Sequence, residues 1–177
     1  MQPPQRFETE RLVLRPPTLA DAEAIFQTYA QDPQVTRYLI WKPHRAISET
    51  LEFLSHCVLA WQKKSGFPYV IALKGCDSAI GMIEIRLDGF KADIGYALGR
   101  SYWGKGYMTE AVRALVDWTL SQAGIYRVWA VCDVDNLASA RVLEKAGMQR
   151  EGVLRREIIH PNISPQPRDC YLYAIVK

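Results

Sequence analysis

Few residues of this chain are of the kinds that cross-link a small protein or hold a metal ion. It has four cysteines and three histidines among 177 residues. Cys57, Cys76, Cys132 and Cys170 lie far apart and form no closely spaced pair, so the sequence predicts neither a disulfide framework nor a zinc site. We expect reduced thiols with structural roles and a protein without a metal cofactor.

Long apolar runs and an excess of one charge are also missing. No stretch approaches the roughly 20 apolar residues of a membrane span, and the segment Met1 to Arg6 lacks the apolar core of a signal peptide. The 22 Lys and Arg residues nearly balance the 19 Asp and Glu residues, and the basic residues do not run together. The sequence therefore predicts a cytoplasmic protein with no membrane partner and no direct nucleic-acid partner.

What the chain does contain is the composition of one soluble globular domain over residues 1–177, with 49% hydrophobic and 23% charged residues. A strand is predicted at 12–14, where an apolar run is stopped by two prolines. Thr18 or Asp21 caps a predicted helix that reaches about Tyr29, and Ser48 caps a second helix that reaches about Lys63.

The rest of the chain predicts a sheet. Three strand signals at 69–73, 79–87 and 91–98 are separated by short turns containing Gly75 and Gly89, which indicates an antiparallel meander. The pattern as a whole predicts an α/β (α+β) fold with a mixed, mostly antiparallel sheet and helices on both faces. The elements predicted after the meander are a helix over 107–123, a strand at 127–131, a helix over 137–146, and strands at 148–159 and 170–176.

The most informative segment runs from Asp93 to Met108, where a strand enters a glycine-bracketed turn that opens a helix. Glycines let the backbone turn sharply, and the free amides at a helix start attract phosphate oxygens. The dinucleotide pattern GxGxxG fails here. The nucleotide-binding pattern GxxxxGK[ST] matches Gly99, Gly104 and Lys105, but Gly106 stands where a magnesium-binding hydroxyl is needed. A P-loop also follows the first strand of a parallel sheet, whereas this loop follows an antiparallel meander.

A third phosphate-binding design accounts for several further segments in order and spacing. They are Glu8 to Arg15, Ile94 to Tyr96, Tyr102 to Ala111, Asp135 to Ser139, Leu143 to Met148, and Glu151-Gly152. In these segments the chain resembles the GNAT superfamily of acetyl-CoA-dependent N-acetyltransferases, and within it the RimJ/RimL-like branch of ribosomal-protein N-terminal acetyltransferases. The superfamily's general loop motif has other residues at the places of Trp103 and Met108, a departure that we interpret as a trait of that branch.

The resemblance implies the GNAT fold, with a sheet that is splayed in the middle, and acetyl-CoA as cosubstrate. It implies that the pantetheine arm lies along the strand from Ile94 to Gly99 and the pyrophosphate on the amides of Gly104 to Thr109. An amide near 97–99 is then the natural oxyanion donor. The residues that it assigns to coenzyme A are Ala97, Leu98, Gly99, Gly104, Lys105, Gly106, Tyr107, Met108, Thr109, Asn136 and Ser139.

Amide formation by direct attack in a ternary complex needs an unprotonated amine, an oxyanion donor and a proton for the departing thiolate. The resemblance makes Ser139 the candidate that protonates or anchors the thiolate, although capping of the helix start explains it as well. Asn136 likewise either contacts the coenzyme, as the resemblance implies, or only caps the helix start. Glu84, Asp93 and Glu157 are candidate bases. A solvated charged face is the alternative for Glu84, and a water relay is the alternative to any base.

The acceptor is open at this stage. A protein N-terminal amine, such as that of a ribosomal protein, and a small-molecule amine both fit the resemblance. A coenzyme A sensor and a nucleotide-binding protein are remote alternatives, and the protein is a monomer or a homodimer. We expect His44, His56 and His160 to be surface or loop residues, and Trp103 and Tyr107 to pack on the sheet. The residues that the resemblance assigns to the acceptor pocket, with packing as the alternative, are Arg37, Tyr38, Trp41 and Arg45.

Overall fold

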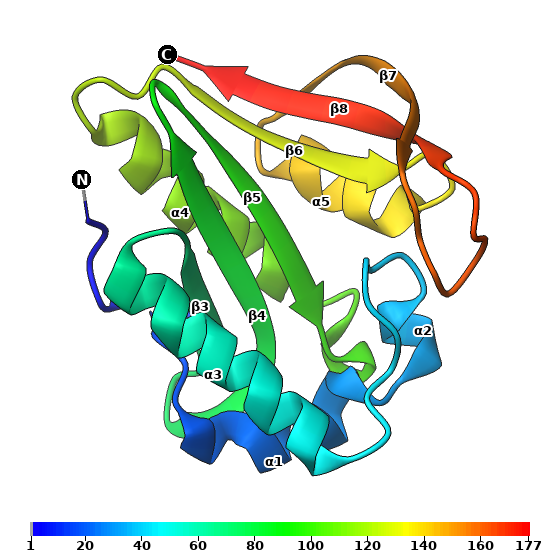
Figure 1. The fold of residues 1–177 in the computed structure, drawn as a ribbon. Helices are drawn as coiled ribbons and strands as arrows, with labels where there is room; N and C mark the ends of the chain where they lie inside the picture. The colour runs from blue at the N-terminus through cyan, green and yellow to red at the C-terminus, as the bar shows by residue number, and fades with distance from the viewer. Residues whose placement is uncertain (1) are drawn as a thin grey trace.

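The structure, a computed structural model, describes residues 2–177. Its strands are β1 (Phe7–Glu8), β2 (Leu12–Arg15), β3 (Phe67–Leu73), β4 (Cys76–Asp88), β5 (Lys91–Leu98), β6 (Arg127–Asp133), β7 (Gln149–Ile158) and β8 (Arg168–Val176). They form one sheet in the spatial order β1-β2-β3-β4-β5-β6-β8-β7 (Figure 1). All neighbouring strands are antiparallel except β5 and β6. The predicted mixed, mostly antiparallel sheet is confirmed.

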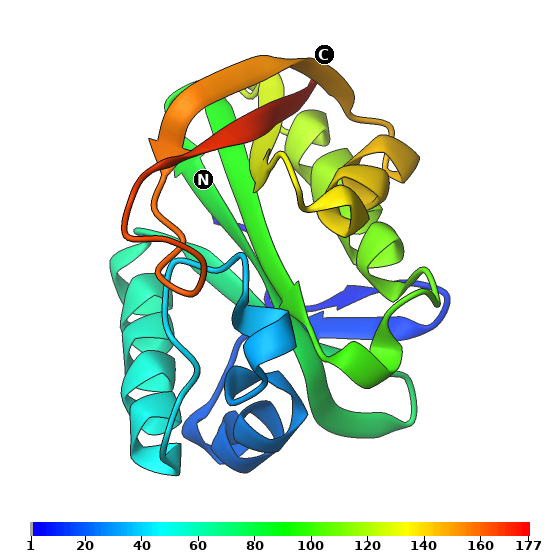
Figure 2. The ribbon, with the colours of Figure 1, turned by 90° about the vertical axis from the view of Figure 1, so that its right-hand side faces the viewer.

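Helices cover both faces of this sheet (Figure 2). The helices are α1 (Ala22–Ile25), α2 (Pro33–Thr36), α3 (Ile47–Lys63), α4 (Tyr107–Ser121) and α5 (Leu137–Lys145). Because side chains alternate along a strand, Ile83 of β4 joins the core under α4 and α5, while its neighbour Met82 joins a second core under α1 and α3. In residues 2–177 we find no helix with the length and apolar character that a bilayer crossing requires.

The first helical region differs most from the prediction. A 3₁₀ turn at Leu19–Asp21 precedes α1, and a π-helical turn at Phe26–Ala30 extends it. The short helix α2, which begins at a proline after the capping residue Asp32, was not predicted. Ser48 does not cap α3: the helix starts one residue earlier, where the Glu49 carboxylate reaches back to accept the Arg45 amide at 3.1 Å.

β5 and β6 separate after a short parallel ladder (Figure 1). The pairs run only from Lys91 with Arg127 to Asp93 with Trp129. Beyond them β5 continues against β4, and β6 continues against β8. An opening therefore lies between residues 94–98 of β5 and residues 130–133 of β6, as the predicted splay requires.

Candidate active site

The loop between β5 and α4 presents a row of free backbone amides. Gly104 and Gly106 have φ of +72° and +81°, a left-handed backbone that glycine adopts without steric cost. The Gly106 carbonyl accepts the Glu110 amide at 3.0 Å, which begins the helix. Among residues 2–177, no protein acceptor receives a hydrogen bond from the amides of Gly104 to Thr109. With the positive end of the α4 dipole behind them, these amides fit a pyrophosphate.

Among the described residues 2–177, no strand pairs with the edge of β5 that faces the opening. On its other side, the Gly99 amide donates to the Ile80 carbonyl at 2.9 Å, so this residue bonds toward β4. Hydrogen-bonding direction alternates along an antiparallel strand, so Ala97 also bonds toward β4, while Tyr96 and Leu98 turn their amides into the opening. Within the stretch 97–99, the Leu98 amide is the group that is free for an oxyanion.

Two hydroxyl groups meet beside this edge. Ser139 lies in the first turn of α5, where its amide donates to Asn136 Oδ1 at 3.2 Å, so Asn136 caps the helix as predicted. Ser139 Oγ is 2.8 Å from the hydroxyl oxygen of Tyr96. The Tyr96 hydroxyl also lies 3.3 Å from the Ser139 carbonyl oxygen. A tyrosine from β5 and a serine from α5 thus form one hydrogen-bonded pair.

Burial sets the protonation of this part of the opening. It raises the pKa of Tyr96 above its ordinary value and outweighs the opposite effect of the bond to Ser139. It likewise raises the pKa of the Cys132 thiol, on β6, to about 11, against a lowering by Ser139. At neutral pH Tyr96 is therefore a proton donor and Cys132 is a neutral thiol.

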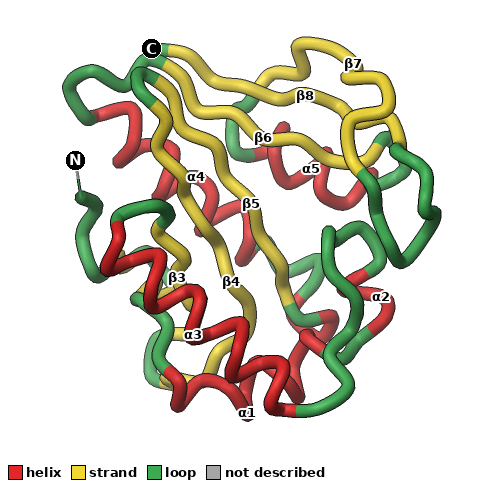
Figure 3. Tube along the Cα trace, in the orientation of Figure 1, coloured by secondary structure: helices red, strands yellow, loops and turns green. Residues whose placement is uncertain are grey.

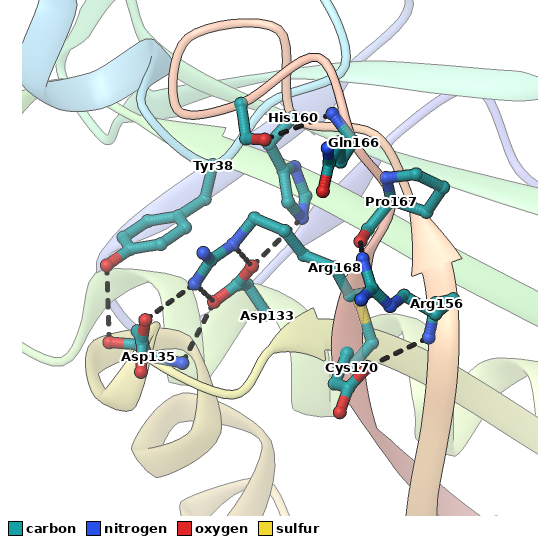
Figure 4. A network of polar contacts seen from close by, with 11 residues as sticks. Tyr38, Asp133, Asp135, Arg156, His160, Gln166, Pro167, Arg168 and Cys170 are labelled. Atoms are coloured by element: carbon teal, nitrogen blue, oxygen red, sulfur yellow. Dashed lines mark hydrogen bonds and ion pairs between the residues drawn. The ribbon is translucent and has the colours of Figure 1, made fainter.

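A buried ion-pair network lies at the end of β6 (Figure 4). The Asp133 carboxylate is fully buried and accepts Arg168 Nε at 2.6 Å and Arg168 Nη2 at 3.0 Å. The same Nη2 lies 2.5 Å from Asp135 Oδ2. His160 Nε2 is 3.6 Å from Asp133, and among residues 2–177 neither ring nitrogen has a hydrogen-bond partner. The network joins β6, β8 and the loop between β7 and β8.

The charges in this network follow from burial and pairing. Burial opposes ionisation of Asp133, but the bonds from Arg168 and the Asp135 amide outweigh it and hold the pKa of Asp133 below its ordinary value. Burial also lowers the pKa of His160, and the attraction of Asp133 offsets this only in part. His160 is thus neutral at pH 7, while Asp133 is ionised.

Two loops that are distant in sequence meet at the mouth of the opening (Figure 3). From the β7–β8 loop, Asn162 Nδ2 donates to the carbonyls of Thr36 and Trp41, each at 2.7 Å. From the α2–α3 loop, the Tyr38 hydroxyl donates to the Asp135 carbonyl at 3.3 Å, just before α5. The start of α5 and both loops therefore form one rim.

The candidate bases lie apart from the hydroxyl pair. Glu84 and Asp93 point to the α3 side of the sheet, where both carboxylates pair with Arg86. Glu157 is exposed on an irregular stretch of β7, between the residues that pair at Leu154 and Ile158. Glu84 and Asp93 thus lie on the opposite face of the sheet from Tyr96 and Ser139.

His160 is a loop residue, as predicted, and it is 3% exposed because its loop folds back onto Asp133. The expectation for Trp103 needs correction. Trp103 does not pack into the sheet: it is 44% exposed, and its indole N–H donates to the Leu98 carbonyl at 2.7 Å. Tyr107 packs against the core as predicted.

The remaining candidates divide between packing and exposure. His44 Nδ1 lies 2.8 Å from Thr50 Oγ1, and its ring packs on Trp41 with centroids 4.9 Å apart, so both aromatic groups have a packing role. His56 and Arg45 are exposed. The Arg37 guanidinium lies 5.5 Å from the Tyr38 ring centroid at the rim.

Comparisons with known proteins agree with this architecture. Residues 11–149 match the model of the acetyltransferase (GNAT) domain. The "uncharacterized N-acetyltransferase YoaA" of Bacillus subtilis is 35% identical over 174 residues, 97% of this chain and 96% of that protein. The [ribosomal protein uS5]-alanine N-acetyltransferase of Escherichia coli is 25% identical over 189 residues, covering 98% and 91%. The crystal structure of the microcin C7 self-immunity acetyltransferase MccE with acetyl-CoA and AMP has a TM-score of 0.85 and 25% identity, covering 95% and 93%.

The splayed sheet, the free amides at the start of α4 and these matches define an acetyl-CoA-dependent N-acetyltransferase, which transfers an acetyl group to an amine. The chain belongs to the GNAT acetyltransferase family, and its relatives are consistent with the RimJ/RimL-like branch. The nucleotide-binding alternative is set aside, since the glycine loop follows the antiparallel strands β3, β4 and β5.

Sequence reasoning missed Tyr96 as a chemical group and the ion-pair network around Asp133. The alternation of β5 was the available signal for Tyr96, because it places this residue on the same face as Ile94 and Leu98, toward α4 and α5. Its partner Ser139 is 43 residues away, and no local pattern connects the two. The same holds for Asp133 and Arg168, which are 35 residues apart.

Proposed function

We propose that the acceptor is the α-amine of a protein or peptide N-terminus. The observation that carries this proposal is a set of exposed apolar side chains on the rim: Ile40 is 72% exposed, Leu137 54% and Ile159 48%. They belong to the three segments that the contacts of Asn162 and Tyr38 hold together. Exposed apolar side chains on separate segments suit an extended peptide better than a small polar amine.

The chemistry of the acceptor supports the same choice. An N-terminal amine has an ordinary pKa of about 7.7 to 8.0, so roughly a tenth of it is already unprotonated at pH 7, whereas a lysine amine near 10.4 needs a stronger base. Glu84 is ion-paired and Glu157 is exposed, so an acceptor that asks little of a base fits this opening. The relative that acts on the alanine of ribosomal protein uS5 points in the same direction.

For the transfer itself we propose separate roles on the two sides of the opening. The Leu98 amide stabilises the oxyanion that develops on the thioester carbonyl. Ser139 delivers a proton to the departing thiolate and takes one in turn from the Tyr96 hydroxyl, which is protonated at neutral pH before the transfer and regains its proton from solvent afterwards. Glu157 or Glu84 accepts the proton that the attacking amine loses, directly or through water.

A thiol-release assay with matched acceptors tests the proposal. The panel contains short peptides with free N-termini, one of which begins with alanine. These peptides are compared with the same peptides carrying blocked N-termini, with free amino acids and with polyamines. We expect the free N-terminal peptides to have kcat/KM at least about 100-fold above the small amines, a ratio within the range that acceptor contacts can supply. Preferred turnover of a small amine, or of an amine that carries a nucleotide such as the AMP in the MccE structure, overturns the proposal.

A further inference from the structure

Arg11, directly before β2, contacts the loop between β5 and α4. Its Nη1 donates to the Lys105 carbonyl at 3.0 Å, within the loop. Its Nε donates to Glu110 Oε2 at 2.7 Å, in the first turn of α4. Its guanidinium carbon lies 4.6 Å from the ring centroid of Tyr107, the first residue of α4. One side chain therefore touches the loop, the helix start and the helix's first turn.

Glu110, the acidic partner of Arg11, carries a charge that affects anion binding at the start of α4. Its carboxylate accepts the Thr9 hydroxyl at 2.5 Å and the Arg11 amide at 2.8 Å, in addition to the Arg11 side chain. Burial opposes its ionisation, but these bonds outweigh burial and lower the pKa of Glu110, so it is ionised at neutral pH. A carboxylate in the first turn stabilises a helix, yet it also opposes any anion that binds at the same helix start.

An open pocket lies beside this contact. Thr9, Glu10 and Arg11 form an open pocket of about 510 Å³ together with Gly106, Thr109 and other residues of α4 and α5. Two of these, Gly106 and Thr109, carry amides that have no protein acceptor among residues 2–177. The pocket therefore shares Gly106 and Thr109 with the cradle assigned to pyrophosphate.

We propose that Arg11 is a positioning residue for acetyl-CoA: it neutralises Glu110, so that this charge does not oppose the phosphates at the loop amides. The inference rests on the assignment of the amides of Gly104 to Thr109 to pyrophosphate. A purely structural clamp is the competing explanation. The two explanations differ in the role that they give to charge. A clamp needs both Arg11 and Glu110, whereas a residue that only neutralises Glu110 is not needed for acetyl-CoA binding once Glu110 is uncharged.

A double-mutant cycle separates the two explanations. Acetyl-CoA affinity is measured by calorimetry for the wild type, Arg11→Gln, Glu110→Gln and the double variant, with melting temperatures alongside. We expect Arg11→Gln to weaken binding about tenfold, because it leaves the Glu110 charge at the helix start. The double variant is expected to recover to within about threefold of the wild type while its melting temperature stays as low as that of either single variant.

A measurement at high salt and a control ion pair elsewhere in the protein complete the test. At about 1 M salt the Debye length is about 3 Å, so the difference between Arg11→Gln and the double variant should shrink. Arg127 and Glu151, a paired guanidinium and carboxylate on β6 and β7, provide the control: the same cycle there should leave acetyl-CoA affinity unchanged. Affinity that follows melting temperature through the cycle, with no recovery in the double variant, overturns the inference. If Gly106→Ala also leaves affinity unchanged, the loop assignment itself fails.

Discussion

The hydroxyl oxygen of Tyr96 lies 2.8 Å from Ser139 Oγ, although 43 residues separate them in the chain. Tyr96 belongs to β5, whose free edge offers the Leu98 amide, and Ser139 belongs to the first turn of α5. The contact brings a buried proton donor to a serine at the opening of the sheet. It therefore connects the strand that we assign to the thioester with the group that we assign to the leaving thiolate.

Replacement of the two hydroxyls tests this connection. Ser139→Ala should lower kcat by about 100-fold, the usual range for loss of a general acid, and Tyr96→Phe should lower it by about tenfold. The double variant should be no slower than Ser139→Ala alone, because Tyr96 acts through Ser139. Steady-state kinetics with an accepted peptide gives these values. Tyr69→Phe is the control, since its hydroxyl bonds to the Pro4 carbonyl at 2.6 Å, away from the opening; additive losses at Tyr96 and Ser139 would contradict the relay.

A side chain at Gly106 should weaken acetyl-CoA binding. Both Gly106 and Gly75 have φ of +81°, so alanine at either position carries a similar strain of about 1–2 kcal/mol. Only Gly106 lies in the amide cradle, and its new methyl group would come within 3.4 Å of Arg11 Nη2. Calorimetry should show about a tenfold loss for Gly106→Ala. Gly75→Ala should melt lower yet bind normally, and equal affinities in the two variants would exclude the loop as the phosphate site.

Loss of Arg168 should destabilise the protein through Asp133. The Asp133 side chain is 0% exposed, so Arg168→Gln leaves a buried carboxylate without its main partner. We expect the unfolding free energy to fall by about 3 kcal/mol, at the low end for a broken buried pair because Arg168 keeps 26% of its side chain exposed. Urea titration provides the value. Asp133→Asn in the same background should recover part of the loss, and the exposed pair of Arg6 and Glu8 should tolerate Arg6→Gln without a measurable change.

His160 should make stability depend on pH below neutrality. Its folded pKa is lowered, so the unfolded chain takes up the proton first, and its contribution to stability is full above the unfolded pKa of about 6.5. That contribution is lost as the pH falls through 6.5 toward the folded pKa. His160→Gln should therefore flatten the decline of unfolding free energy between pH 7.5 and 5.5. Part of the slope should persist, because burial lowers the pKa of His44 as well; an unchanged slope in the variant would contradict the assignment.

Local signals predicted most of the elements correctly. The helix from Tyr107, the three meander strands and the Asn136 cap depend on periodicity, turn residues and capping within a few positions, and all are present. α2 was missed because it spans only Pro33–Thr36, which is too short for a periodic pattern. The Ser48 cap was wrong because α3 begins at Ile47, so Ser48 lies inside the first turn of the helix and not before it.

The sequence by itself determined the loop that we assign to the donor: the glycines, the helix that follows and their order after an antiparallel meander all follow from local patterns. Only the tertiary structure decided where β5 leaves β6, that Tyr96 reaches Ser139, and that Arg11 braces the loop next to Glu110. Backbone conformation at a glycine or a helix start depends on neighbouring residues, whereas these contacts join segments 43 and 99 residues apart. They exist because the sheet and its two helical layers pack them together.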